Sequence, residues 1–210
     1  MRMRKEPGMT SYRAMIFDIG GVLVPLRFQR AYASMEAACG LPGEEIRRRM
    51  AASGLSASYE RGEMSDAEFT AAVCRLLDAD LTEEQFRTLW CSIFDVETII
   101  PVEFLAQLRQ RHRMLLLSNT NGIHVARLRA KCAAMEHFDD AVLSYEVGWM
   151  KPDGRMFEEA VRRAGCNAGQ CFYTDDIEAN VEAARSVGID AVLFEGFDGL
   201  RAAIQARGIL

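Results

Sequence analysis

Short apolar runs that end in polar residues decide the fold, and the first of them is residues 14–21, AMIFDIGG. Its four apolar residues predict a buried strand, and the aspartate followed by two glycines predicts a tight turn. Comparable runs follow at residues 113–117, 141–143, 171–174 and 191–194, separated by stretches in which apolar residues have helical spacing. Nearly all-apolar strands that alternate with helices are typical of a parallel sheet covered by helices on both faces. The predicted fold class is therefore α/β.

The sequence between the first two predicted strands has a different texture. From about residue 28 to residue 97, apolar and charged residues alternate at helical spacing, as in residues 67–77, AEFTAAVCRLL. Ser65 or Asp66, followed by Glu68, predicts the start of a helix. We therefore expect an all-helical insertion at residues 26–97, and a core formed by residues 1–25 and 98–210.

The composition excludes several classes of protein. The chain has 210 residues, 50% hydrophobic and 26% charged, with a formal net charge of −5. This composition is ordinary for a folded protein, and the acidic balance argues against a nucleic-acid partner. No run approaches about eighteen apolar residues, and the basic first eight residues precede no apolar segment. We expect a loose tail at residues 1–8, no membrane partner, a cytoplasmic location with reduced thiols, and a monomer or a homodimer.

Polar side chains collect at the predicted strand ends. Asp18 ends the first strand, Ser118 the second, and Asp175 and Asp176 the fourth, while Lys151 lies in the loop after the third. Ligands of parallel sheets bind in the crevice outside the carboxyl ends of the strands. We therefore expect these side chains to form one site.

Several of these residues also have an ordinary structural explanation. An aspartate such as Asp18 is common in turns, and Ser118 or Thr120 can cap the following helix, whose N-terminus is also an anion site. Capping of the next helix explains either Asp175 or Asp176, but not both. Adjacent carboxylates raise each other's pKa unless a cation compensates them, and Mg²⁺ is a hard cation that prefers oxygen ligands. The pair therefore indicates a magnesium site.

Together these residues indicate a reaction at phosphorus. Asp18 is a carboxylate nucleophile, which divides the reaction into two easier steps through an aspartyl-phosphate intermediate. Mg²⁺ and Lys151 would shield the negative charges of a phosphate from that carboxylate. The prediction is a Mg²⁺-dependent phosphatase whose substrate is a small phosphorylated metabolite.

Four segments resemble, in order and spacing, the motifs of the haloacid dehalogenase superfamily of hydrolases. They are residues 17–23, 117–121, 151–153 and 173–180. Together with residues 59–65, YERGEMS, they look like the branch that contains α-D-glucose-1-phosphate phosphatases and the phosphatase domain of soluble epoxide hydrolases. The resemblance implies a Rossmann-like core with an inserted helical cap that chooses the substrate.

The resemblance also implies roles for the residues of a metal site. Asp18 would be the nucleophile and a Mg²⁺ ligand, and Gly20 would offer its backbone carbonyl to the metal. Asp176 would bind Mg²⁺ directly, whereas Asp175 and Asn180 would not bind the metal but would surround and orient the residues that do.

By the same resemblance, Ser118 and the Asn119 amide would hold the phosphate, and Lys151 would bind both the phosphate and Asp18. One position departs from the family pattern, because Gly20 stands where phosphatases usually carry a second aspartate as general acid and base. Loss of a general acid costs a factor of about 10² to 10⁴. A sugar 1-phosphate needs protonation less, since its leaving oxygen is more acidic than an alcohol. A hexose 1-phosphate is therefore the substrate that fits Gly20 best.

Two alternatives remain beside the phosphatase. A 2-haloacid dehalogenase uses a similar aspartate nucleophile at carbon, needs no metal and also lacks the second aspartate, but it does not explain Asp175 and Asp176. A non-catalytic protein that binds a phosphoryl ligand is the other alternative, because a fold does not guarantee turnover.

Other residues have weaker signals. Residues 59–61, Tyr-Glu-Arg, could face a substrate, but a turn between two helices explains them equally well. His112, His124 and His137 lack the spacing of metal ligands, and we expect them on the surface or on helix faces.

Overall fold

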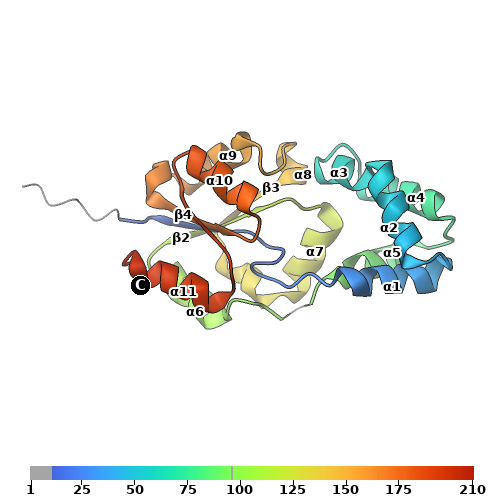
Figure 1. The fold of residues 1–210 in the computed structure, drawn as a ribbon, viewed down its shortest axis with the longest axis horizontal. Helices are drawn as coiled ribbons and strands as arrows, with labels where there is room; N and C mark the ends of the chain where they lie inside the picture. Colours follow the sequence, from blue (N-terminus) through green and yellow to red (C-terminus); the bar gives the residue numbers. More distant parts are fainter. Residues whose placement is uncertain (1–10, 96) are drawn as a thin grey trace, which may run out of the picture.

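The computed structural model describes residues 11–95 and 97–210. At its centre is a five-stranded parallel sheet in the order β3-β2-β1-β4-β5 (Figure 1). The strands are β1 (Ala14–Phe17), β2 (Arg113–Ser118), β3 (Asp140–Leu143), β4 (Cys171–Asp175) and β5 (Asp190–Leu193). The predicted α/β fold with a Rossmann-like parallel sheet is confirmed. The predicted loose tail at residues 1–8 lies outside the described residues.

Alternate residues of each strand face opposite helical layers, as the two-residue period of a strand requires. In β1, Met15 and Phe17 pack in one hydrophobic cluster and Ala14 and Ile16 in the other, and all four side chains are fully buried. Burial of each large apolar side chain stabilises the fold by about 1.5–3 kcal/mol. The first cluster includes α6 (Val102–Arg109), α7 (Gly122–Lys131) and α11 (Phe197–Ala206), and the second includes α9 (Gly154–Ala164) and α10 (Glu178–Ser186).

Shorter elements complete this part of the chain. They are η2 (Ala133–His137), α8 (Ser144–Val147) and η3 (Ala168–Gln170). α7 ends at Lys131, because Cys132 adopts an extended conformation before η2.

Residues 28–93 form a separate group of helices, which we call the helical segment; it lies at the right of Figure 1. It has a hydrophobic cluster of its own, in which Tyr59 and Phe69 stack with ring centroids 4.1 Å apart. The predicted helix start is present as a reciprocal cap, because the Ser65 hydroxyl accepts from the Glu68 N–H and the Glu68 carboxylate accepts from the Ser65 N–H. The helices are α1 (Phe28–Cys39), α2 (Gly43–Ser53), α3 (Leu55–Glu60), α4 (Asp66–Leu77), α5 (Glu83–Trp90) and η1 (Cys91–Ile93).

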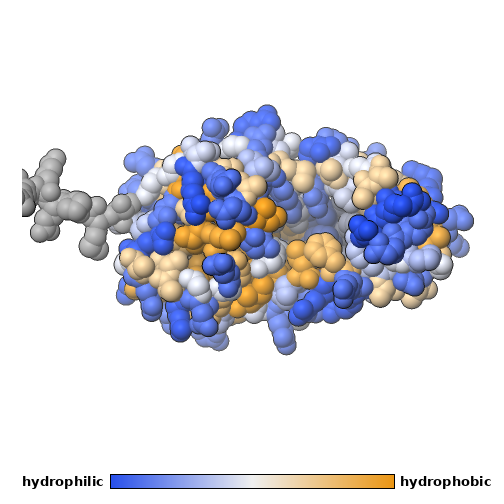
Figure 2. Space-filling view, in the orientation of Figure 1, coloured by the Kyte–Doolittle hydropathy of each residue, from blue (hydrophilic) through white to orange (hydrophobic). Residues whose placement is uncertain are grey.

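The helical segment joins the sheet part, which we call the core, through two kinds of contact. Where the chain passes between the two parts, Leu26 forms an isolated antiparallel β-bridge with Phe94, and the Ile99 N–H donates to the Leu23 carbonyl at 2.9 Å. Farther along, the Ile123 N–H in the first turn of α7 donates to the Tyr59 hydroxyl at 3.3 Å. Figure 2 shows the surface hollowed between the two parts. In the described ranges, none of the helices is both long enough and apolar enough to span a membrane.

Candidate functional site

A buried lysine connects the ends of the two central strands. Lys151 Nζ lies 2.8 Å from Asp18 Oδ1 and 2.6 Å from Asp175 Oδ2, and the lysine side chain is only 2% exposed. Asp18 follows β1 and Asp175 ends β4, and these strands are direct neighbours. The Asp18 N–H donates to the Thr174 carbonyl at 3.1 Å, which continues the pairing past the end of β1. The parallel sheet thus brings three of the predicted site residues into contact.

Asp175 is held by several donors besides the lysine. Asn180 Nδ2 lies 3.0 and 3.1 Å from its two oxygens, and the Ile177 N–H donates to Oδ1 at 2.9 Å. The Tyr173 hydroxyl donates to Asp175 Oδ2 and lies 3.2 Å from Lys151 Nζ. With no exposed surface and so many donors, Asp175 is fixed in place.

Sequence reasoning missed Tyr173. The sequence does contain an indication of its role. Residues two apart on a strand point to the same face, and Tyr173 precedes Asp175 by two. Tyr173 looked like one more apolar residue of a buried strand. In the structure its ring is buried in the core while its hydroxyl takes part in the site.

The loop that carries Lys151 is held by the loop after β2. Asn119 Oδ1 accepts from the Lys151 N–H at 2.7 Å, and Asn119 Nδ2 donates to the Lys151 carbonyl at 3.0 Å. This pair of bonds sets the height of the lysine above the sheet. The Ser118 hydroxyl is buried nearby, 3.4 Å from the Asn119 carbonyl oxygen, at the long limit of a hydrogen bond.

The N-cap of α7 is Asn121, a residue of the same loop after β2. Asn121 Oδ1 accepts from the His124 N–H at 3.0 Å, so neither Ser118 nor Thr120 has the capping role that the sequence left open. The Thr120 N–H donates to the Ser144 hydroxyl at 2.9 Å instead. The capping explanation for Ser118 is therefore removed.

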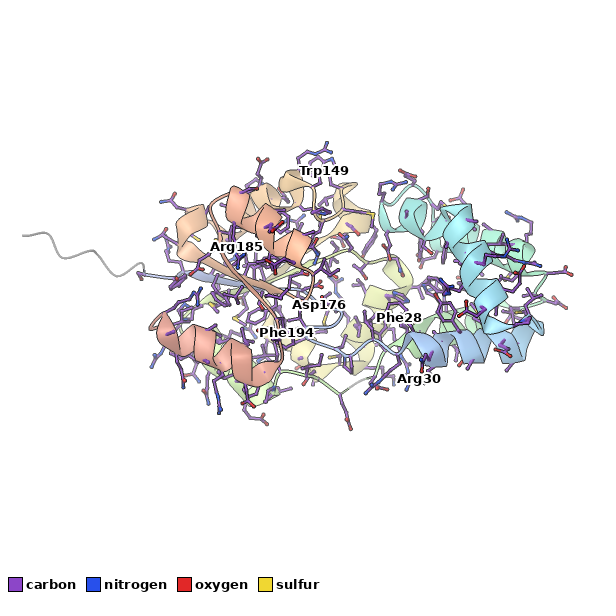
Figure 3. The ribbon with its side chains drawn as sticks, in the orientation of Figure 1. Phe28, Arg30, Trp149, Asp176, Arg185 and Phe194 are labelled. Carbon is purple, nitrogen blue, oxygen red and sulfur yellow. The ribbon has the colours of Figure 1, made fainter. Side chains whose placement is uncertain are left out.

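Three carboxylates gather where a cation fits. Asp18, Asp175 and Asp176 each offer an oxygen, and these oxygens lie within 4.8 Å of one another. Lys151 compensates one of the three negative charges, and a bound divalent cation would compensate the other two. Hard oxygen donors of this kind suit Mg²⁺. In Figure 3, Asp176 is seen at the end of the sheet that faces the helical segment.

The turn after β1 holds the exposed carboxylate of Asp176 against its backbone. A Cβ atom on Gly21 would lie 2.1 Å from Asp176 Oδ2, and Gly21 has a φ of +80°. Glycine is therefore required here both for the left-handed conformation and for the close approach of the carboxylate.

The protonation of these groups follows from burial and pairing. Burial raises the pKa of Asp18, although Lys151 counteracts this. Burial alone would lower the pKa of Lys151, but Asp18 and Asp175 outweigh it and raise this pKa. The same lysine and the hydrogen bonds to Asp175 overcome its burial and lower its pKa, whereas burial and the neighbouring Asp175 raise the pKa of Asp176. Lys151 therefore stays charged beside the Asp175 carboxylate.

Gly20, which stands where the family usually carries a second aspartate, is packed against Leu26. A Cβ atom on Gly20 would lie 3.0 Å from Leu26 Cδ1, so Leu26 would have to move to admit a larger side chain. The Leu26 side chain therefore fills the space that a side chain at position 20 would need.

His124 lies on a helix face, one of the two expected places, but on the buried face of α7 rather than at the surface. Its ring stacks on Trp90 with centroids 5.5 Å apart, and Nε2 lies 3.2 Å from the Trp90 carbonyl oxygen. Burial lowers the pKa of His124 to about 4, so the ring is neutral near pH 7. It belongs to the contact between α7 and the helical segment.

Comparison with known proteins gives the family. A sequence model of haloacid dehalogenase-like hydrolases matches residues 12–188. A phosphatase of Mycobacterium tuberculosis is 30% identical over 191 residues, covering 88% of each chain. A D-ribitol-5-phosphate phosphatase of Bacteroides thetaiotaomicron is 24% identical over 183 residues, covering 84% of this chain and 88% of the relative.

Solved structures agree with the fold. A haloacid dehalogenase family enzyme from Bacteroides thetaiotaomicron, in complex with magnesium and inorganic phosphate, has a TM-score of 0.78 at 24% identity and covers 87% of this chain and 94% of its own. A haloacid dehalogenase-like hydrolase from Porphyromonas gingivalis has a TM-score of 0.79 at 25% identity, covering 95% and 98%. The superfamily suggested by the four motifs is confirmed, and this chain belongs to the haloacid dehalogenase-like hydrolase family.

Proposed function

We propose that this hydrolase is a Mg²⁺-dependent phosphatase that cleaves a small phosphorylated metabolite through an aspartyl-phosphate intermediate on Asp18. The observation that carries the proposal is the buried Lys151 between Asp18 and Asp175, with the Asp176 carboxylate close by. A site with one lysine and three carboxylates suits a divalent cation together with a phosphate dianion, since it otherwise carries excess negative charge.

The residues divide the chemistry among them. The Asp18 carboxylate attacks phosphorus, and Lys151 stabilises the charge of the phosphoryl oxygens while Asn119 keeps the lysine loop in place. Ser118 lies at the end of β2, next to this position, and supplies a hydroxyl and backbone amide environment for phosphate. Mg²⁺ bound by Asp18, Asp176 and the Gly20 carbonyl would supply the electrostatic shielding that lets a carboxylate approach a phosphate. Asp175 holds Lys151, and Asn180 in turn holds Asp175.

Supporting observations also narrow the substrate class. Two curated relatives are named phosphatases, and one of them acts on D-ribitol 5-phosphate. We propose a phosphorylated sugar or sugar alcohol, and a hexose 1-phosphate as the form that demands least protonation of its leaving oxygen. The comparison of a hexose 1-phosphate with the matching 6-phosphate tests this choice: hydrolysis of the 1-phosphate no faster than that of the 6-phosphate contradicts it.

We also propose that residues 26–97 are a cap over the site and determine which leaving group is accepted. This agrees with the separate hydrophobic cluster of the helical segment. The proposal further places the protein in the cytoplasm as a monomer or homodimer, in line with its scattered cysteines, which are free thiols among the described residues.

The phosphatase is preferred over the two alternatives on physical grounds. A metal-independent dehalogenase would expose an anionic substrate to Asp176 without a cation to shield it. A phosphoryl-ligand binding protein has no need for a carboxylate poised beside a buried lysine.

The experiment is a screen of phosphorylated metabolites with and without Mg²⁺, with Asp18→Asn as the blank. We expect phosphate release that requires both Mg²⁺ and Asp18. Activity that persists in excess chelator contradicts the proposal, and binding of phosphorylated compounds without turnover supports the binding protein instead.

A further inference from the structure

The reaction needs a proton carrier that the core does not offer. When an alkyl phosphate is cleaved, the leaving oxygen must gain a proton, and the water that later attacks the aspartyl-phosphate must lose one. Asp175 is held by Lys151, Tyr173 and Asn180, and the Tyr173 hydroxyl is itself bonded to Asp175. Position 20 has no side chain. The ionisable groups described at the strand ends are therefore committed to the nucleophile, the lysine or the cation site.

In-line geometry indicates where the missing group lies. The attacking and leaving oxygens are on opposite sides of phosphorus. With Asp18 attacking from the end of β1, the leaving group points away from the sheet and toward the helical segment. Because position 20 offers no side chain for this role, the helical segment is where we look for a proton carrier.

Glu60, the last residue of α3, lies between two contacts with the core. On one side the Tyr59 hydroxyl accepts from the Ile123 N–H at 3.3 Å, just beyond the loop that contains Ser118. On the other side the backbone at Gly62 touches the carbonyl of Tyr145, because a Cβ atom on Gly62 would lie 2.1 Å from that oxygen. Figure 1 shows α3 facing α8 at this junction. The backbone that carries Glu60 is thereby held between the first turn of α7, which follows the loop after β2, and α8, which follows β3.

The carboxylate of Glu60 is partly buried and unpaired. No hydrogen bond or ion pair to another described residue involves it, and burial by itself raises its pKa to about 7. A carboxyl group with this pKa is available in both protonation states at neutral pH, as a donor and then an acceptor requires.

The charged groups around α3 are engaged with other partners. On α3's own turn Arg61 pairs with Glu63, and on α4 Asp66 pairs with Arg87 of α5. Arg49 of α2 pairs with Glu45, and Glu146 of α8 accepts from the Tyr145 hydroxyl. Glu60 is left as the carboxyl group of this junction that can exchange protons with a substrate.

We propose that Glu60 is the acid and base of the reaction, an inference that rests on the proposed phosphatase function. In the first step the bond between Asp18 and phosphorus forms, the bond to the leaving oxygen breaks, and the Glu60 proton moves to that oxygen to give an alcohol. In the second step water attacks the phosphorus, its proton returns to Glu60, and the bond between phosphorus and Asp18 breaks. Phosphate and both carboxyl groups are regenerated in their starting forms.

The test compares Glu60→Gln with the wild type on two esters in the presence of Mg²⁺. One is the alkyl phosphate that the wild type cleaves fastest in the metabolite screen, and the other is p-nitrophenyl phosphate, whose leaving group needs no proton. On the alkyl ester we expect kcat to fall by about 10²-fold or more. On p-nitrophenyl phosphate we expect a burst of about one equivalent of p-nitrophenol followed by slow turnover, because only the second step needs the base.

Glu63→Gln is the matched control. Glu63 is exposed, lies on the same turn and pairs with Arg61, so its loss removes an equal charge without touching the substrate. We expect this variant to keep wild-type kcat on both esters.

Three outcomes overturn the inference while the wild type remains active: Glu60→Gln keeps kcat within about threefold on the alkyl ester, changes KM alone, or loses activity on both esters without a burst. Each of these leaves the phosphatase function intact. If the wild type cleaves neither ester in Mg²⁺, the proposed function itself fails, and the role of Glu60 fails with it.

Discussion

Gly21→Ala tests whether the turn after β1 holds Asp176 in the cation site. The new methyl group would lie 2.1 Å from Asp176 Oδ2, whereas ordinary contact begins near 3.4 Å, so the carboxylate must move by about 1.3 Å. The clash is with the end of an exposed side chain, which can rotate away. The fold is therefore expected to survive, and the cost falls on the position of Asp176.

Gly21→Ala should affect both the stability of the fold and the function of the cation site. Alanine at a φ of +80° costs about 1–2 kcal/mol of stability through its left-handed backbone. A displacement of about 1 Å in a catalytic group lowers the rate by about 10²-fold, and misplaced metal ligands weaken metal binding by at least about 10-fold.

Gly165→Ala is the matched control. Gly165 follows α9, has a φ of +67°, and a Cβ atom there would meet nothing within 4 Å. The two variants are expected to lose similar stability in urea denaturation, but only Gly21→Ala should need more Mg²⁺ for half-maximal phosphatase activity and bind it more weakly in calorimetry. Equal Mg²⁺ requirements in the two variants would show that the turn after β1 does not position Asp176.

Three further predictions concern the buried groups. Asp175→Asn weakens the buried hydrogen bonds of the carboxylate to Lys151 and Tyr173 while Lys151 keeps Asp18, and we expect a loss of about 1–3 kcal/mol in the free energy of unfolding, measured in urea; no measurable loss contradicts the buried pairing. Tyr173→Phe removes a hydroxyl bonded to Asp175 and is expected to destabilise by about 1–3 kcal/mol, with unchanged far-UV circular dichroism as the control. For Glu60, whose pKa rises from 4.5 to about 7 on folding, stability is lost as pH rises between these values, so Glu60→Gln should gain about 3 kcal/mol of stability relative to the wild type between pH 4 and pH 8; a pH-independent difference contradicts the raised pKa.

The features that could be predicted from the sequence are those that follow from strand period and sheet topology. Asp18 and Asp175 come directly after buried runs, so a parallel sheet must bring them to one edge. Lys151 could be predicted to join them, because its loop follows β3 and returns to the same edge. The structure adds that it lies between the two carboxylates, 2% exposed.

The features that escaped prediction depend on side-chain contacts between distant segments. His124 is buried only because Trp90 of the helical segment covers it. The Asn119 side chain holds the backbone of Lys151, a pairing across 32 positions that no local pattern indicates. The cap of α7 is hard to predict for a similar reason. Residues 118–121 are all polar, so several of them could cap the helix, and only the geometry of the loop shows that Asn121 does so.

The proposed function requires that Asp18 becomes phosphorylated. The most direct measurement mixes enzyme, substrate and Mg²⁺, quenches within one turnover, reduces any aspartyl-phosphate with borohydride to homoserine, and locates the product by peptide mass spectrometry. We predict homoserine at position 18 in the wild type with Mg²⁺, and none in chelator or in Asp18→Asn. Turnover that continues while Asp18 stays unmodified at every quench time would exclude Asp18 as the nucleophile.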